Sequence, residues 1–185
     1  MSYRALVAAA MMLLPIPVQA KTEALSVEQR LQRIEDEAAI KRVILQYAVR
    51  LDARDFDGYV SLFAKDGVWQ NGDTVKHGRD EIKAMLVGIY GNPPPGFVNN
   101  DSYRIVSNIE VTLDGDRATA HSRQLTIMRD KNGSPRPALS GIYEDRFIRE
   151  DGEWKILHRN DITVMPTPEE WRKQMAEMRA QQASD

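Results

Sequence analysis

Cysteine is absent from the 185-residue sequence, and histidine occurs only three times, as His77, His121 and His158. Without cysteine the chain forms neither a disulfide nor a thiolate nucleophile or metal ligand. No two histidines have the spacing of metal ligands, so we expect no metal site. The formal net charge of −2 provides no basic surface, which argues against nucleic acid as a partner.

Several enzyme motifs are missing too: the G-x-S-x-G string of hydrolases, a phosphate loop and a dinucleotide fingerprint. We therefore expect no cofactor. With 42% hydrophobic and 28% charged residues, the composition is that of an ordinary globular domain. Because cysteine is absent and histidine is rare, any chemistry is limited to carboxylate, tyrosine and arginine side chains.

The N-terminal residues differ in character from the rest of the chain. Arg4 precedes an apolar run over residues 5–14, and the stretch ends in Val18-Gln19-Ala20. A basic start, a short apolar run and an A-x-A-like end are typical of a secretory signal peptide. Roughly ten apolar residues are short for a membrane span, so an uncleaved anchor is the weaker alternative. We expect an exported, periplasmic protein that is cut after Ala20 and has no membrane association afterwards.

Beyond this segment, the hydrophobic pattern predicts helices first and strands afterwards, as in an α+β domain. The expected helices span Val27–Leu51, a short segment capped by Asp55, Arg79–Ile89, and Pro168 to about Gln181. A short strand at Val68–Asn71 precedes four longer ones, which turn residues connect as antiparallel neighbours: Tyr103–Leu113, Arg117–Arg129, Leu139–Glu150 and Glu153–Val164.

We divide the chain into a signal peptide (1–20), a lead-in helix segment (21–34), one domain (35–165) and a C-terminal helix with tail (166–185). In the first half of the long helix, Leu31, Ile34 and Ala38 are out of phase with the later apolar stripe. We interpret this half as more exposed and able to cover a partner.

Several local strings occur together in one order. They are Tyr47 to Tyr59 with Leu62 to Trp69, Gly78 to Ile82, Asn108 with Gly115 to Ala120, and Tyr143 to Asp145 with Asp151 to Ile156. Over about Glu35 to Val164, this set resembles a SnoaL-like domain of the nuclear transport factor 2-like superfamily. The resemblance implies a cone, in which a curved antiparallel sheet wraps around the long helix. Two shorter helices and an extra C-terminal helix complete it, and an apolar pocket opens at its wide end.

Asp52 is the first candidate for catalysis, because the long helix ends there. The negative end of a helix dipole and partial burial both raise a carboxyl pKa, which suits a general base. The resemblance implies the same, since an aspartate at the matching position assists catalysis in scytalone dehydratase-like relatives. The alternative is an aspartate that only forms the turn before Asp55.

Relatives often carry catalytic histidines, and this sequence lacks them. Arg104 stands where the resemblance implies one histidine, and Ala138 to Ser140 stand near the second. An arginine can stabilise an oxyanion or bind a carboxylate but cannot transfer protons. Tyr143 is a further candidate for the oxyanion. His158, in phase with Trp154 and Ile156, is the best histidine candidate, while strand alternation predicts that His121 faces outward.

Other polar or aromatic side chains are candidates for binding a ligand: Tyr47, Trp69, Asn71, Tyr103, Ser122, Gln124 and Asp145. The leading hypothesis is a cofactor-free lyase or isomerase, of the dehydratase type, that acts on a small hydrophobic carbonyl compound. A non-catalytic binder of a small apolar ligand and an interaction protein stay open as alternatives. For the last, the resemblance implies a homodimer through the exposed face of the sheet.

Overall fold

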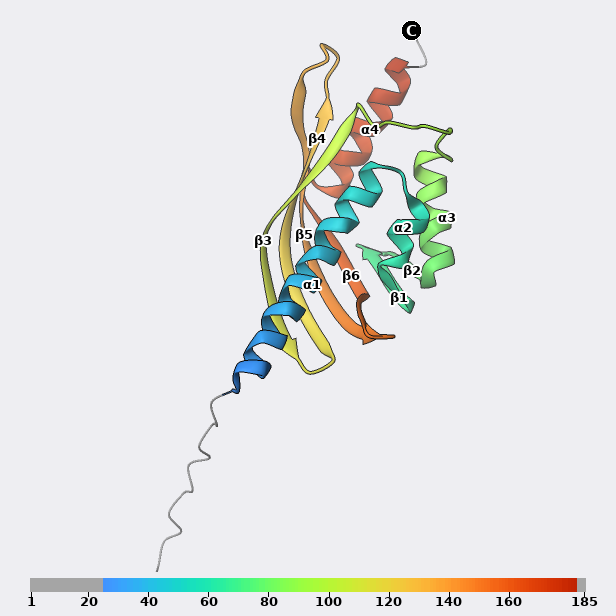
Figure 1. Cartoon of the computed structure of the whole chain (residues 1–185). Helices are drawn as coiled ribbons and strands as arrows, with labels where there is room; N and C mark the ends of the chain where they lie inside the picture. Colours follow the sequence, from blue (N-terminus) through green and yellow to red (C-terminus); the bar gives the residue numbers. More distant parts are fainter. Residues whose placement is uncertain (1–24, 183–185) are drawn as a thin grey trace, which may run out of the picture.

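The longest helix, α1 (Val27–Asp52), begins at a capping box in which Ser26 and Gln29 exchange side-chain and backbone hydrogen bonds. The structure is a computed structural model that describes residues 25–182 (Figure 1). Apolar side chains on one side of the second half of α1 are fully buried, including Ile40, Ile44 and Tyr47. The expected signal peptide lies outside the described residues. Among residues 25–182, no helix is long and apolar enough to cross a membrane.

The remaining elements follow in the expected order. After α1 come α2 (Phe56–Ser61), β1 (Phe63–Asn71), β2 (Thr74–His77) and α3 (Gly78–Tyr90). Four long strands and a last helix complete the chain: β3 (Ser102–Asp114), β4 (Arg117–Arg129), β5 (Pro135–Glu150), β6 (Glu153–Met165) and α4 (Pro168–Gln182). The strand order is β2-β1-β6-β5-β4-β3, with antiparallel neighbours except for the parallel pair β1–β6.

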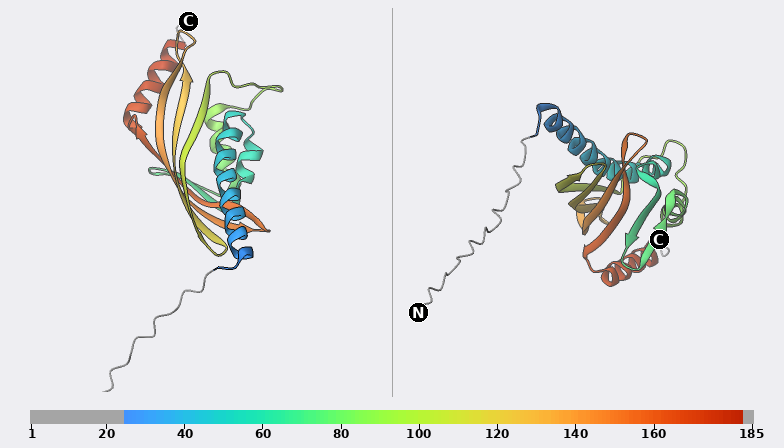
Figure 2. Two further views of the ribbon diagram at one scale, coloured as in Figure 1. Left: turned by 60° about the vertical axis from the view of Figure 1, so that its left-hand side comes forward. Right: turned by 90° about the horizontal axis from the view of Figure 1, so that it is seen from below.

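The curved sheet wraps around α1, and α2 and α3 lie on the same side as α1 (Figures 1 and 2). The predicted α+β cone is therefore confirmed. The expected early strand is longer than predicted and belongs to a hairpin with β2, which the sequence pattern did not indicate. The short helix ends at Ser61. Gly67 lies in β1, where an added Cβ would be 2.9 Å from the carbonyl oxygen of Ile156 in β6.

A β-bulge in β6 determines which side chains reach the interior. Ile156 pairs with Phe147, but His158 pairs with Arg146, so Leu157 is one extra residue in β6. An extra residue reverses the alternation of side chains along a strand. Ile156 and Arg159 are consequently both buried on the inner face, whereas His158 is on the outer face.

Aromatic rings fill the centre of the cone. Tyr47 contacts Tyr59, Phe63 and Tyr143, with ring centroids 4.5, 6.3 and 5.4 Å apart. Each of these four side chains is at most 1% exposed. This cluster joins α1 to the sheet and forms the floor beneath the polar groups described next.

Candidate functional site

Asp52 and Arg104 form an ion pair where α1 meets β3. The helix ends there because Arg54 has a positive φ of 56°, which turns the chain towards α2. One carboxylate oxygen of Asp52 accepts a hydrogen bond from Nη1 of Arg104 at 2.6 Å, and the other accepts one from the backbone N–H of Arg104 at 2.8 Å. The two side chains are 20% and 12% exposed, respectively, so the pair remains accessible.

The second amino group of Arg104 donates to the hydroxyl of Tyr90 at 3.1 Å. Asn99, in the loop before β3, donates to the carbonyl oxygen of Asp52 at 3.0 Å. These contacts hold the guanidinium in one position at the edge of the interior. Since both carboxylate oxygens of Asp52 already bind Arg104, the geometry favours a positioning role for Asp52.

Asp161 is a second acidic group of the interior, and it comes from β6. It pairs with Tyr143 of β5, which in turn pairs with Ser122 of β4, so the three residues form one row across the inner face. Among residues 25–182, no side chain donates a hydrogen bond to the Asp161 carboxylate, because Asn71 binds the backbone carbonyl oxygen instead. Asp161 is partly buried on this inner face.

Burial raises the pKa of Asp161 from its usual 3.8 to about 6, although the nearby charges of Arg159 and Arg104 act in the opposite direction. Such a carboxylate is ionised at neutral pH and can still accept a proton. Burial also raises the pKa of Tyr143 well above 10.0, and the Asp161 charge adds to this. Tyr143 therefore remains a neutral O–H donor beside the carboxylate.

Arg159 lies beneath this row and is completely buried. Its guanidinium binds both oxygens of Asp145, at 2.7 and 2.6 Å, and lies between the rings of Tyr47 and Tyr143, at 3.8 and 4.2 Å. The carboxylate of Asp145, expected to bind a ligand, is thus occupied by this ion pair. The Nη1 atom of Arg159 has no hydrogen-bond partner among the described residues.

Five other predicted site residues face the interior. Trp69 donates its indole N–H to the hydroxyl of Tyr47 at 2.9 Å, which ties β1 to α1. Asn71 donates to the carbonyl oxygen of Asp161 at 2.6 Å and to Oγ1 of Thr163 at 3.1 Å, which ties β1 to β6. Ser122 and Gln124 are buried on β4, with the Ser122 hydroxyl unpaired within residues 25–182.

Two expected site residues lie on the opposite face of the sheet. Side chains alternate along β3, so Arg104 faces the interior and its neighbour Tyr103 faces outward. Tyr103 is consequently 51% exposed. His158 binds Gln70 at 3.2 Å on the outer face, because the bulge at Leu157 reverses the phase of β6. The inward orientation expected for His158 is wrong, and Tyr103, a candidate for ligand binding, does not face the interior. The prediction that His121 faces outward is confirmed.

The same bulge explains why Arg159 and Asp161 were missed. Alternation counted from Trp154 assigns both to the outer face, and one extra residue cannot be recognised in the sequence without a glycine or another local signal. The string Arg159-Asn160-Asp161 places two charged residues in a strand that is otherwise rich in apolar residues, and this is the sequence signal for polar groups there.

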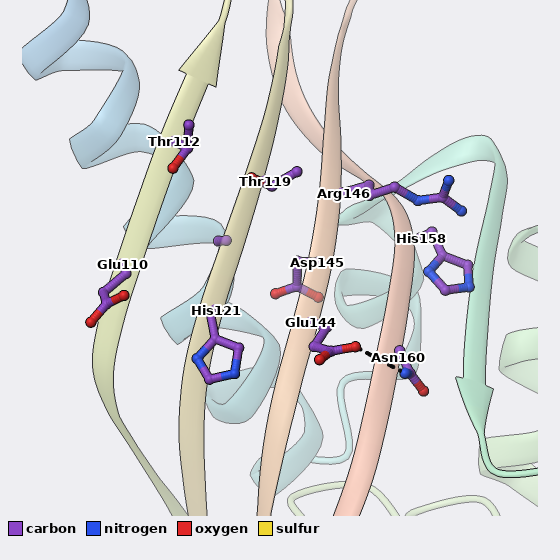
Figure 3. Close-up of a pocket in the computed structure, with 10 residues that line it drawn as sticks. Glu110, Thr112, Thr119, His121, Glu144, Asp145, Arg146, His158 and Asn160 are labelled. Carbon is purple, nitrogen blue, oxygen red and sulfur yellow. Dashed lines mark hydrogen bonds between the residues drawn. The ribbon is translucent and has the colours of Figure 1, made fainter.

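Two cavities lie outside the interior. One, of about 430 Å³, is on the outer face of β3 to β6 and is lined by polar side chains including Glu110, His121, Glu144 and His158 (Figure 3). The other, of about 450 Å³, lies between the start of α1 and the end of β3. Neither is the apolar pocket expected at the wide end of the cone. Within residues 25–182, no group of three acidic or histidine side chains is arranged to hold a metal.

Comparison with known proteins identifies the family. A model of the SnoaL-like domain matches residues 32–160. The chain belongs to the SnoaL-like family. No curated protein matches this SnoaL-like chain significantly.

Solved structures agree with this assignment. A candidate scytalone dehydratase from Novosphingobium aromaticivorans is 28% identical, with a TM-score of 0.61 over 74% of this chain and 89% of that one. An NTF2-like protein with a cystatin-like fold from the same organism is 21% identical, with a TM-score of 0.67 over 77% and 90%. A protein of unknown function from Mycobacterium tuberculosis is 23% identical, with a TM-score of 0.63 over 73% and 75%. The last two similarities concern the fold alone.

Proposed function

We propose that this SnoaL-like protein is an exported, cofactor-independent lyase or isomerase that removes a proton next to the carbonyl group of a small hydrophobic molecule. One observation carries the proposal: the Asp161 carboxylate is partly buried, has no hydrogen-bond partner among the described residues and has a pKa raised to about 6. The similarity to a candidate scytalone dehydratase agrees with this reaction class.

In the proposed reaction, Asp161 accepts the proton on the carbon next to the carbonyl, and the C–H electron pair forms an enolate. Arg104, held by Asp52 and Tyr90, donates hydrogen bonds to the enolate oxygen. An isomerase then returns the proton from Asp161 to another carbon. A lyase instead expels a β-hydroxyl group, which takes up that proton and leaves as water.

The aromatic floor supports a hydrophobic substrate. The buried rings of Tyr47 and Tyr143 lie behind the polar row, and the partly buried Trp69 lies beside them with its indole N–H on the hydroxyl of Tyr47. The charge of Arg104 lowers the pKa of Asp161 and also that of Tyr143, so these groups act on one electrostatic region. A ligand that reaches Asp161 is therefore within the influence of the guanidinium.

The test measures exchange of α-hydrogens with deuterium by NMR, because this step requires no knowledge of the product. The probes are small cyclic and aromatic ketones, with and without a β-hydroxyl group. Loss of a general base typically lowers a rate by about 10²–10⁴. We expect such a loss in Asp161→Asn, a smaller loss in Asp52→Asn, and none in the control Glu144→Gln on the outer face of β5.

A larger loss in Asp52→Asn than in Asp161→Asn would restore Asp52 as the base. The non-catalytic alternative also has support, since Arg104 cannot transfer protons. Saturable binding of the same ketones without any exchange would establish a ligand-binding protein instead of an enzyme.

A further inference from the structure

A second apolar stripe runs along α1 on the side that faces solvent. Its large members are 45–72% exposed, although they belong to the most hydrophobic residue types: Val27, Leu31, Ile34, Leu45 and Val49. At the start of α1, Ile34 and the neighbouring Arg30 and Glu37 line the cavity of about 450 Å³ against the end of β3, but Ile34 is still 65% exposed. The burial of Ile40, Ile44 and Tyr47 accounts for the other side only.

The exposed stripe has the spacing of a coiled-coil seam. Steps of four and three residues lead from Val27 to Leu31, Ile34 and Ala38, and after Lys41 the steps continue to Leu45. Residues at this spacing share one line along a helix, about a third of a turn away from the buried line. The pattern from Val27 to Leu45 covers about two and a half heptads, with the charged Lys41 at one seam position, and its large apolar members are not buried by the domain itself.

Charged residues flank the seam in a pattern that fits a second copy. In a parallel pair, the residue just before a seam residue such as Leu31 contacts the other helix. Its partner there is the residue whose number is five higher. Arg30 then meets Glu35 of the second copy, and Glu37 meets Arg42 of the second copy. Both contacts join opposite charges, and Glu37 also forms an ion pair with Lys41 of its own helix at 2.6 Å. An antiparallel pair with the stripes overlapped brings Glu37 close to Glu37 of the second copy, which is repulsive.

The outer face of the sheet, expected from the family resemblance to form a dimer, is less suited to this role. Its central cavity is lined by charged and polar side chains, among them Glu110, Glu144 and Arg146 (Figure 3). Interfaces between copies of a chain are richer in apolar residues, and charges are depleted at their centres.

We propose that the solvent-facing stripe of α1 is an interaction surface that pairs in parallel with α1 of a second copy of this chain. The pairing covers the apolar seam and leaves the inner polar row of each copy accessible from its own side. It does not depend on the proposed enzymatic function.

The absence of cysteine allows a direct test by cross-linking. Leu31→Cys and Leu45→Cys each place one thiol in the seam, and a parallel pair brings each thiol opposite its copy. We expect both purified variants to form disulfide-linked dimers under mild oxidation, while the control Val98→Cys, 70% exposed in the loop before β3, remains monomeric. A disulfide-linked dimer of Ala38→Cys, when Leu31→Cys and Leu45→Cys both stay monomeric, would overturn the parallel arrangement.

Molar mass in solution gives a second test. We expect a dimer by light scattering at tens of micromolar, and a monomer for the doubly substituted Leu31→Asp/Leu45→Asp chain with an unchanged circular dichroism spectrum. Ile105→Asp, on the outer face of β3, serves as the matched control and is expected to stay dimeric. A monomeric Ile105→Asp with a dimeric helix variant would identify the sheet as the interface, and a monomeric unsubstituted chain would refute pairing.

A charge exchange tests the proposed contacts themselves. Glu35→Arg is expected to weaken dimerisation at low salt by placing two arginines together, and Arg30→Glu/Glu35→Arg is expected to restore it. Equal weakening by the single and the double substitution would contradict the pairing of Arg30 with Glu35.

Discussion

Replacing Asp161 with asparagine should stabilise the fold at neutral pH. Burial raises the pKa of this carboxyl from 3.8 to about 6, so in the folded protein the ionised form is disfavoured. One pKa unit corresponds to about 1.4 kcal/mol, which sets an upper value of about 3 kcal/mol for the penalty above pH 6. Partial exposure of the residue reduces this figure, and we expect a gain of about 1–3 kcal/mol in the free energy of unfolding.

The sign of the pH dependence follows from proton binding. Between about pH 4 and 6, the folded state keeps the proton on Asp161 while the unfolded state has released it. The contribution of Asp161 to stability therefore falls as pH rises through this window and is lowest above it. Asparagine does not titrate, so the advantage of Asp161→Asn should be close to zero at pH 4 and largest at pH 7.

Urea unfolding of both chains at a series of pH values measures this difference. At pH 7 the gain corresponds to roughly 2–4 °C in Tm per kcal/mol for a domain of this size. Glu144→Gln, on the outer face, should show no such dependence. A loss of stability in Asp161→Asn, or a difference that does not vary between pH 4 and 7, would show that burial does not raise the pKa of Asp161.

Three further substitutions test the interior. Asp145→Asn leaves the buried charge of Arg159 without its partner and should cost about 3–5 kcal/mol, measured by urea unfolding; a cost below 1 kcal/mol would contradict the burial of this pair. Ser122→Ala removes a buried hydroxyl that has no partner among the described residues, so stability should stay within about 1 kcal/mol or rise; a larger loss would reveal a missing partner. Gly141→Ala should lower Tm, at a cost of about 1–3 kcal/mol, because an added Cβ would be 2.6 Å from the carbonyl oxygen of Ile162; an unchanged Tm would show that the strands can separate.

Most of the fold could be predicted from the sequence because local signals agree with the tertiary structure. Turn residues such as Asp151 and Gly152 have positive φ angles at the connection of β5 and β6, which is why the strand ends were found within a few residues. The strand Arg117–Arg129 was predicted with the observed bounds. The start of β1 was missed because its apolar residues, led by Phe63, also fit the helical spacing of α2.

The candidate site was harder to predict because it depends on register. Asp52 could be proposed from its place at the end of a helix and Arg104 from the family resemblance, and the two side chains do meet. Asp161 could not be proposed, because its inward orientation results from the bulge at Leu157 and not from the pattern of hydrophobic residues. Because of this one extra residue in β6, Asp161 faces the interior and His158 faces outward.

The proposed reaction requires the Asp161 carboxylate to accept a proton near neutral pH. Carbon-13 NMR of the aspartate side-chain carboxyls, with Asp161→Asn used to assign the resonance, follows its titration directly. We expect a midpoint near pH 6 for Asp161. A midpoint near the ordinary value of 3.8 would contradict this expectation and remove Asp161 from the proposed reaction.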